Sequence, residues 1–377
     1  MNLDLITTLF AFILSFQTIV LIVLTQKRYP NSTRHRLLVL MLVFYLLSLL
    51  NFAVFHTLFL YNYVSWIPFV QLELVFGFGP SLYLFTKSLT DSSYRFTSRE
   101  WLHFIPVLLE FVFYRTSWFR TGAIPLYERP SSVENVIFLA VQWGGLLSVV
   151  VYLTISISLL WHYRKWVKER FSNLERRRLH WYEKGVVAYG IFWLVWILFQ
   201  ISDIFLFQQT LKPYYFNLGF IIVAILTLWI ALQGYAAKQN ETAGFLGDLN
   251  RVPKRQQDTS QLESIAKTLQ AIMDEKQYYL DSDLTLSKLS KLTTIPERDI
   301  SRALNHVLNA NFHEFVNDYR VATFKSNLQL EELSHLSLLG IALESGFGSK
   351  STFNLVFKAK EGITPKQYLQ KVQTKRS

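Results

Sequence analysis

Seven apolar runs dominate the first 235 residues and restrict this part of the chain to a helical membrane fold. A helix needs about 20 apolar residues to cross ~30 Å of hydrocarbon, where its backbone groups must bond to one another. Hydrophobic residues make up 51% of the sequence and charged residues only 17%, against about 25% in ordinary soluble domains. The predicted spans are Leu5–Leu24, Leu37–Phe59, Ile67–Leu89, Trp101–Tyr114, Val136–Leu160, Val186–Phe207 and Tyr215–Leu232.

The basic residues between these runs predict an orientation. Cytoplasmic loops are enriched in Lys and Arg. The first, third and fifth loops hold 15 of these residues, and the second, fourth and sixth hold 4. We therefore expect an inner-membrane protein with its amino terminus outside and, after seven spans, its carboxyl terminus in the cytoplasm. A cleaved signal peptide is disfavoured because Asp4 precedes the first run and Lys27 and Arg28 follow it, which reverses the usual order.

The fourth run leaves the number of spans open. It holds 14 residues before Arg115 and contains Pro106, so its length also suits a re-entrant or interfacial segment. Removing this run alone would place the carboxyl terminus outside, and we therefore count it as a span. In the third run, the sequence from Gly77 to Pro80 predicts a kink.

Ionisable side chains inside the predicted spans are candidate ligand or switch positions, because such residues usually face a bundle interior or a cavity. They are Glu73, Asp203, Glu110 and His56. One interpretation is a pocket for a cationic or hydrogen-bonding ligand, or a proton-sensitive switch. The other is hydrogen bonding between helices by protonated carboxyl groups, and the sequence leaves both open.

Catalytic and metal-binding patterns are missing from the sequence. The chain has no cysteine, which excludes disulfides and Cys-based zinc sites. It also has no paired histidines at metal-ligand spacing, no nucleophile elbow and no phosphate-binding loop. We therefore expect that the protein is not an enzyme and carries neither a metal nor another cofactor.

The stretch from Ile341 to Pro365 predicts two helices joined by a tight turn. Gly346 lies where the chain must turn with positive φ, and Ser349 can cap the second helix. Phe353 and Phe357, four residues apart, give that helix an apolar stripe. Its open faces then carry donors suited to phosphates or base edges, namely Lys350, Ser351, Asn354 and Lys358.

An earlier stretch, about residues 284–308, predicts another unit of the same kind. An apolar series ends near Leu292, and Pro296 suits the first turn of the next helix. In that helix Ile300 and Leu304 point inward. The other side carries Arg298, Ser301, Arg302 and Asn305, and arginine is the commonest bidentate reader of guanine. On composition alone, a solvated charged face is the commoner explanation of such residues.

The later unit resembles the second helix-turn-helix of AraC/XylS-type transcription regulators. The spacing that carries the resemblance is Ile-Ala…Glu-x-Gly-Phe…Ser-x-x-Phe…Phe-Lys…Gly-x-Thr-Pro…Tyr, which ends at Tyr368. The resemblance covers roughly Gln261–Lys371 and implies that the four polar residues of the earlier unit occupy recognition positions. Asn309 stands where the family often has Gly, and Gly348 replaces a usual polar residue.

Phe312–Ala322 resembles the family's connecting helix, which sets the two recognition helices into successive major-groove faces. By its architecture the whole chain resembles the membrane-bound subgroup, in which a multi-span sensor precedes the AraC-type domain. The expected fold is thus all-α, with a seven-helix transmembrane bundle at 1–237, a linker at 238–260 and a cytoplasmic DNA-binding domain at 261–377. The second helix-turn-helix is placed at about 337–361.

The predicted function is that of a membrane-anchored one-component transcription regulator. Its partners would be double-stranded promoter DNA, membrane lipid and an unidentified small-molecule or membrane signal, with a homodimer left open. The net charge is +11, yet residues from 238 onward contribute 19 Lys and Arg against 16 Asp and Glu, or +3. Specific contacts are therefore expected from a few residues. The alternative is a transporter or receptor-like membrane protein whose tail is a protein-interaction adaptor.

Overall fold

The structure is a computed structural model that describes residues 3–56, 74–115, 132–175, 177, 179–207, 212–236, 245–249, 259–329 and 336–374. Within these ranges every regular element is a helix, and β pairing amounts to one isolated bridge between Phe171 and Thr285. The predicted all-α class is confirmed for this part of the chain. The chain divides into two compact units: unit 1 comprises residues 1–161 and 179–248, and unit 2 comprises residues 162–178 and 249–377.

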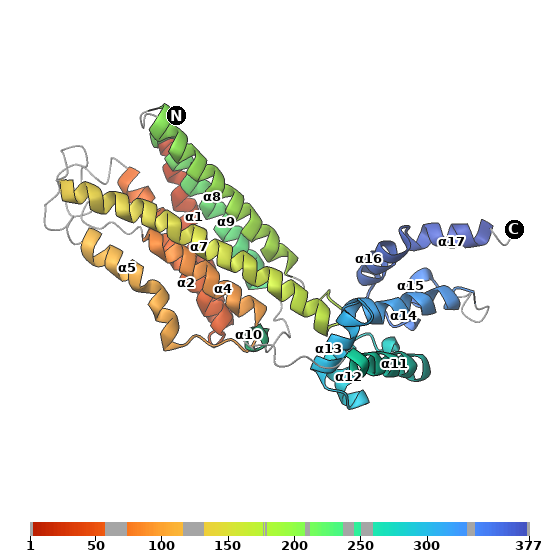
Figure 1. Cartoon of the computed structure of the whole chain (residues 1–377). Helices are drawn as coiled ribbons and strands as arrows, with labels where there is room; N and C mark the ends of the chain where they lie inside the picture. Colours follow the sequence, from red (N-terminus) through yellow and green to blue (C-terminus); the bar gives the residue numbers. More distant parts are fainter. Residues whose placement is uncertain are drawn as a thin grey trace. The chain divides into compact units, whose positions relative to one another are not determined.

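Unit 1 is a bundle of apolar helices (Figure 1). Helix α2 packs against α1, α4 and α9, and α9 also packs against α8. The longer helices are α1 (Leu3–Arg28), α2 (Thr33–His56), α4 (Phe78–Thr90), α7 (Ser132–Arg170, whose last turns lie in unit 2), α8 (His180–Leu206) and α9 (Lys212–Ala236). The shorter ones are η2 (Val75–Gly77), η3 (Ser98–Phe104), α5 (Ile105–Leu109), the π-helical η4 (Glu110–Arg115) and α10 (Phe245–Leu249).

Four helices of the described residues are long and apolar enough to cross a membrane, so the predicted count of seven is not supported. They are Leu9–Arg28, Thr33–Leu50, Ala140–Arg170 and His180–Leu206, and α9 adds a shorter apolar helix at Ile221–Ala236. Orientation in a membrane remains a prediction.

The described parts of the third and fourth runs do not form single long α-helices. In the described part of the third run, a 3-10 turn precedes the 13-residue helix α4. The kink predicted at this junction stays a prediction, and a Cβ on Gly77 would lie 2.2 Å from the Phe44 ring, so the close approach needs glycine. The fourth run changes helix type twice, and Pro106 lies in the first turn of α5, where its missing N–H does the least harm.

Two of the basic loops meet at one end of unit 1. Arg34, at the start of α2, donates to the carbonyl of Gly234 near the end of α9 (Nη2–O 3.2 Å). Asp91, which follows α4, accepts the N–H of Leu246 in α10 (2.9 Å). The first and third loops also line one pocket, so both lie at this end of unit 1, near the carboxyl-terminal end of α9.

Unit 2 contains two small helical cores that share one helix. Its helices are α11 (Thr259–Lys276), η5 (Tyr278–Leu280), α12 (Leu286–Thr293), α13 (Glu297–His306), α14 (Phe312–Asn327), α15 (Leu338–Glu344), α16 (Lys350–Glu361) and α17 (Pro365–Thr374). The first core gathers α11, α12 and α13 around the amino-terminal half of α14, including Phe312 and Val316. The second gathers α15 and α16 around its other half, including Val321 and Phe324. Helix α14 thus connects the two cores, as the predicted connecting helix should.

The sequence-based boundaries at 237 and 261 stay predictions, but the units themselves are not continuous in sequence. Residues 162–178, from the predicted fifth loop, pack within unit 2. Within the predicted linker, residues 245–249 form α10, whose Phe245 is buried. That segment is therefore not a uniform flexible coil.

Candidate nucleic-acid interface

Local signals place the first helix-turn-helix as predicted. Thr285 caps α12 by accepting the N–H of Lys288 at its side-chain oxygen (3.1 Å), and Thr294 ends the helix in the left-handed region at φ 59°. Pro296 directly precedes α13 rather than standing inside its first turn. The inward face of α13 is fully buried, whereas Arg298 and Asn305 are exposed and Ser301 and Arg302 are half-buried.

Two of these polar residues also bond to each other. The amide nitrogen of Asn305 donates to the carbonyl of Ser301 (2.8 Å) and contacts its hydroxyl (3.3 Å). Both are therefore partly engaged within the helix. Arg298 is exposed at the second position of α13, and its role in base contact stays a prediction.

The second helix-turn-helix is held by caps and by one close backbone approach. Ser337 caps α15, and Ser349 caps α16 by accepting the N–H of Thr352 (3.2 Å), which confirms the predicted cap. Gly346 has φ 90°, and a Cβ there would lie 2.4 Å from the carbonyl oxygen of Tyr279. Only glycine fits this turn without displacing the backbone of Tyr279, a residue of the first core.

Helix α16 presents the predicted amphipathic pattern. Phe353 and Phe357 are buried against Phe324 of α14, with ring centroids 4.6 Å and 5.4 Å from it. The four candidate donors, Lys350, Ser351, Asn354 and Lys358, are all exposed. This arrangement leaves a polar helix face suited to contact phosphates and base edges.

The sequence analysis missed a buried polar network around Arg320, which has no exposed surface. Its guanidinium donates to the carbonyls of Tyr279 (2.8 Å) and Asp281 (2.7 Å), to Asn317 Oδ1 (3.2 Å) and to Ser172 Oγ (3.1 Å). Burial lowers the pKa of Arg320 to about 10, so it is still charged at neutral pH. One signal was present, because Arg320 interrupts the four-residue apolar spacing from Phe312 through Val316 to Phe324.

The structure describes the surroundings of only some of the predicted ligand or switch residues of unit 1. The carboxylate of Glu110 accepts the backbone N–H groups of Val75 (3.2 Å) and Phe76 (3.3 Å), a structural role that ties η4 to the turn before α4. Asp203 is buried, with 2% of its surface exposed, and its role stays a prediction. Glu73 and the side chain of His56 lie outside the described residues.

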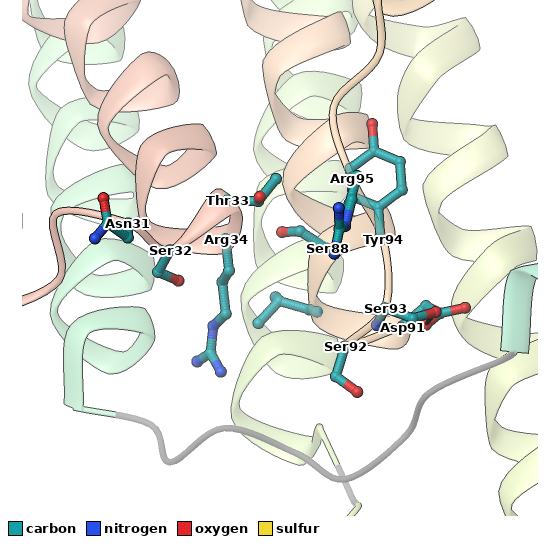
Figure 2. Close-up of a pocket in the computed structure, with 11 residues that line it drawn as sticks. Asn31, Ser32, Thr33, Arg34, Ser88, Asp91, Ser92, Ser93, Tyr94 and Arg95 are labelled. Atoms are coloured by element: carbon teal, nitrogen blue, oxygen red, sulfur yellow. Dashed lines mark hydrogen bonds between the residues drawn. The ribbon is translucent and has the colours of Figure 1, made fainter.

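Another polar feature of unit 1 was not foreseen. A pocket of roughly 470 Å³ lies between the start of α2 and the segment after α4 (Figure 2). Most of its walls are hydroxyl, amide and charged groups: Asn31, Ser32, Thr33, Arg34, Ser88, Leu89, Asp91, Ser92, Ser93, Tyr94 and Arg95. The lining comes from two loops far apart in sequence, so no local pattern marks it. None of the four predicted ligand or switch residues lines it.

No group of three or more His, Asp or Glu side chains is arranged to hold a metal ion among the residues described.

Comparison with known proteins identifies the carboxyl-terminal part. Residues 289–371 match a family described as "Helix-turn-helix domain". An uncharacterised HTH-type transcriptional regulator of Staphylococcus aureus (strain COL) is 32% identical over 97 residues. One of strain MSSA476 is 31% identical over the same length. Each alignment covers 26% of this chain and 13% of the relative. No solved structure matches the chain. Unit 2 therefore contains a helix-turn-helix domain of the kind found in transcription regulators, and the family match lies wholly within unit 2.

Proposed function

We propose that this protein is a membrane-anchored, one-component transcription regulator of the AraC type. Unit 1 would lie in the cytoplasmic membrane and receive a signal, and unit 2 would bind a promoter. The observation that carries the proposal is the pair of helix-turn-helix units joined by α14, each with a polar face on its second helix. Two such units in one chain can read two successive groove faces, so a homodimer is not required.

The surface of unit 1 supports the membrane location. Large apolar side chains are exposed along α1, α7 and α8, for example Phe16 (68%), Leu147 (64%) and Phe205 (79%). A water-soluble protein rarely exposes such continuous apolar surface, whereas lipid covers it at no cost. Unit 1 therefore suits a bilayer.

The orientation proposed from the basic loops gains support from their shared end. The first and third loops line one pocket, and Arg34 joins the first loop to the end of α9. If that end faces the anionic inner leaflet, the chain leaves α9 on the cytoplasmic side. Unit 2 then has access to DNA.

Within unit 2 we assign base contacts first to Arg298 and Arg302, and then to Lys350 and Asn354. Arginine offers the bidentate donor pair that matches guanine. The modest +3 charge from residue 238 onward argues against a broad basic binding surface. Ser301, Asn305, Ser351 and Lys358 flank these positions and would contact phosphates or neighbouring bases.

The test uses the full-length protein in lipid nanodiscs. A random duplex pool is selected on it at about 0.1 M salt, and the enriched duplex is then measured over a salt series. We expect enrichment of one sequence class and an affinity that falls steeply with salt, because phosphate neutralisation releases counterions. The control is the double variant Arg298→Ala with Arg302→Ala, which should lose the sequence preference. If folded protein enriches no sequence and instead captures a protein partner, the tail is an adaptor and this proposal fails.

A further inference from the structure

Between α7 and α8 the chain runs through unit 2 as a strap, defined as residues 170–175, whose middle residues 172–174 are buried. Ser172 has no exposed surface, Asn173 has 8% and Leu174 has 4%. Loops between membrane spans normally lie in water, so burial of this loop in another unit calls for a physical reason.

Ser172 anchors the strap by hydrogen bonds to the segment before α12 and to α14. Its N–H (3.3 Å) and hydroxyl (2.7 Å) donate to the carbonyl of Leu284, just before α12. Its own carbonyl accepts from His313 Nδ1 (2.7 Å) and Asn317 Nδ2 (3.1 Å) on α14. Arg320 adds the bond to its hydroxyl described above. Such a satisfied, buried set of bonds marks a built docking site rather than a chance contact.

From this anchor the strap reaches the first turns of both recognition helices. On one side, Arg170 forms an ion pair with Glu297, the first residue of α13. On the other, the carboxylate of Glu175 accepts a hydrogen bond from Ser349, the cap of α16. Asn173 lies beside the turn before α16, where a Cβ on Gly348 would come within 2.6 Å of its amide nitrogen.

These contacts fall where DNA would have to bind. The amino-terminal residues of a recognition helix enter the major groove, and its free N–H groups attract phosphate. Glu175 places a negative charge at that end of α16, next to the candidate contacts Lys350 and Ser351. Arg170 pairs with Glu297, the residue that precedes the candidate contact Arg298. A phosphate approaching either helix would meet the strap first.

We propose that the strap is an autoinhibitory element: docked, it blocks the starts of α13 and α16, and its release makes unit 2 competent for DNA. This inference rests on the proposed function as a transcription regulator. The strap continues directly from α7 at Arg170 and leads to α8 at His180. A signal that shifts the ends of these helices would therefore act on the strap through the chain itself, without a further partner.

A disulfide can lock the docked state, because the natural chain has no cysteine. A Cβ at position 348 would lie 3.8 Å from Asn173 Cγ. In Asn173→Cys the sulfur would occupy about the position of that Cγ, so a small rotation of the two cysteine side chains brings their sulfurs into bonding range. The variant Asn173→Cys with Gly348→Cys is prepared full-length in nanodiscs. Binding to the duplex enriched by the wild-type protein is then measured oxidised and after reduction.

The oxidised protein should bind at least about tenfold more weakly than the same sample after reduction. Each single-cysteine variant, carried through the same oxidation, should show no such change. Equal or tighter binding by the locked protein would overturn the inference, because docking would then be compatible with DNA.

A second variant does not depend on a new bond. Glu175→Gln keeps the shape of the side chain and removes its charge from the start of α16. It should raise affinity for the same duplex by about two- to fivefold, the usual effect of one charge at a helix end. Affinity unchanged or lowered would count against the strap. If wild type, reduced and Glu175→Gln proteins all fail to bind any duplex, the proposed function itself has failed, which is a separate outcome.

Discussion

Replacing Arg320 with methionine tests how much the buried network contributes to unit 2. Methionine has nearly the same length, so the packing of α14 is kept and the four hydrogen bonds are lost. The Asp281 carbonyl keeps the N–H of Leu284 (3.1 Å), and the Ser172 hydroxyl still donates to Leu284. The remaining loss falls on two carbonyl oxygens, the backbone oxygen of Tyr279 and the side-chain Oδ1 of Asn317, which have no other donor among the described contacts.

An acceptor left without its donor in a buried site costs about 1–3 kcal/mol. Two such carbonyls give about 2–6 kcal/mol, and removal of a buried charge offsets part of this. We therefore expect Arg320→Met to lower the free energy of unfolding of unit 2 by about 2–4 kcal/mol. That is a large share of the roughly 5–15 kcal/mol that holds a typical domain together.

The assay must isolate unit 2 within the full-length protein. Tryptophan fluorescence would mostly report unit 1, because Trp166 alone of the 10 tryptophans belongs to unit 2. Hydrogen exchange in nanodiscs, read on α14 peptides, gives the opening free energy directly. The expected loss corresponds to exchange about 30- to 700-fold faster, at tenfold per 1.4 kcal/mol.

The matched control is Arg298→Met, which removes an exposed arginine from α13 and should stay within about 0.5 kcal/mol of wild type. If α14 exchanges equally slowly in both variants, the network contributes nothing net and the reasoning from unsatisfied carbonyls is wrong.

Three further predictions concern single positions. Arg302→Ala should cost about 1–3 kcal/mol at one base position of the selected duplex, measured by competition with single-base variants; a uniform loss over all duplexes would make Arg302 a phosphate contact. Gly346→Ala should lower the stability of the second helix-turn-helix far more than Gly362→Ala does. Both glycines have positive φ, but only the first would push a Cβ onto the Tyr279 carbonyl; equal exchange of α16 in the two variants would refute this. Glu110→Leu should destabilise unit 1 by about 1–3 kcal/mol, because two partly buried N–H groups lose their acceptor. Unchanged thermal stability in nanodiscs would instead show that those groups find other partners.

The helix-turn-helix units could be predicted because their signals are local. A cap such as Ser349 acts within three residues, and a left-handed position such as Gly346 or Asn309, at φ 49°, shows in the residue type itself. Amphipathic spacing then separates the buried phenylalanines of α16 from its exposed donors. Each of these properties is written in a short window of sequence.

Features that depend on distant segments could not be predicted in this way. Hydropathy gives the length of the third and fourth apolar runs but not their type of helix. In the third run the helix type depends on the close approach of Phe44 to Gly77, and in the fourth run it depends on Pro106. The pocket of unit 1 joins two loops that no periodicity connects. Arg320 was visible only as an interruption of an apolar stripe, because its partners lie 39 to 148 residues away, apart from Asn317.

The shortfall in spans does not by itself reverse the proposed orientation. The third and fourth runs are consecutive, so counting both as spans or neither leaves the number of crossings odd. If α1, α2, α7, α8 and α9 cross, the carboxyl terminus stays opposite the amino terminus in either case. Unit 2 would move to the outside if only one of the two runs crosses, or if α9, the shorter apolar helix, does not cross.

The two connections between the units differ in what they can transmit. The later one includes residues 237–244, which lie outside the described residues and whose polar composition alone predicts a linker. The earlier one is a helix that ends in the anchored strap, so displacement of α7 must either move Ser172 or break its bonds to Leu284 and α14. If the proposed strap is the switch, a signal would reach the recognition helices through the α7–α8 connection. On this reasoning, lengthening the later connection with flexible residues should leave regulation intact, whereas inserting the same residues just before Arg170 should uncouple DNA binding from unit 1. Reporter transcription with each insertion distinguishes the two routes, and loss of regulation from the later insertion alone would refute the strap as the route.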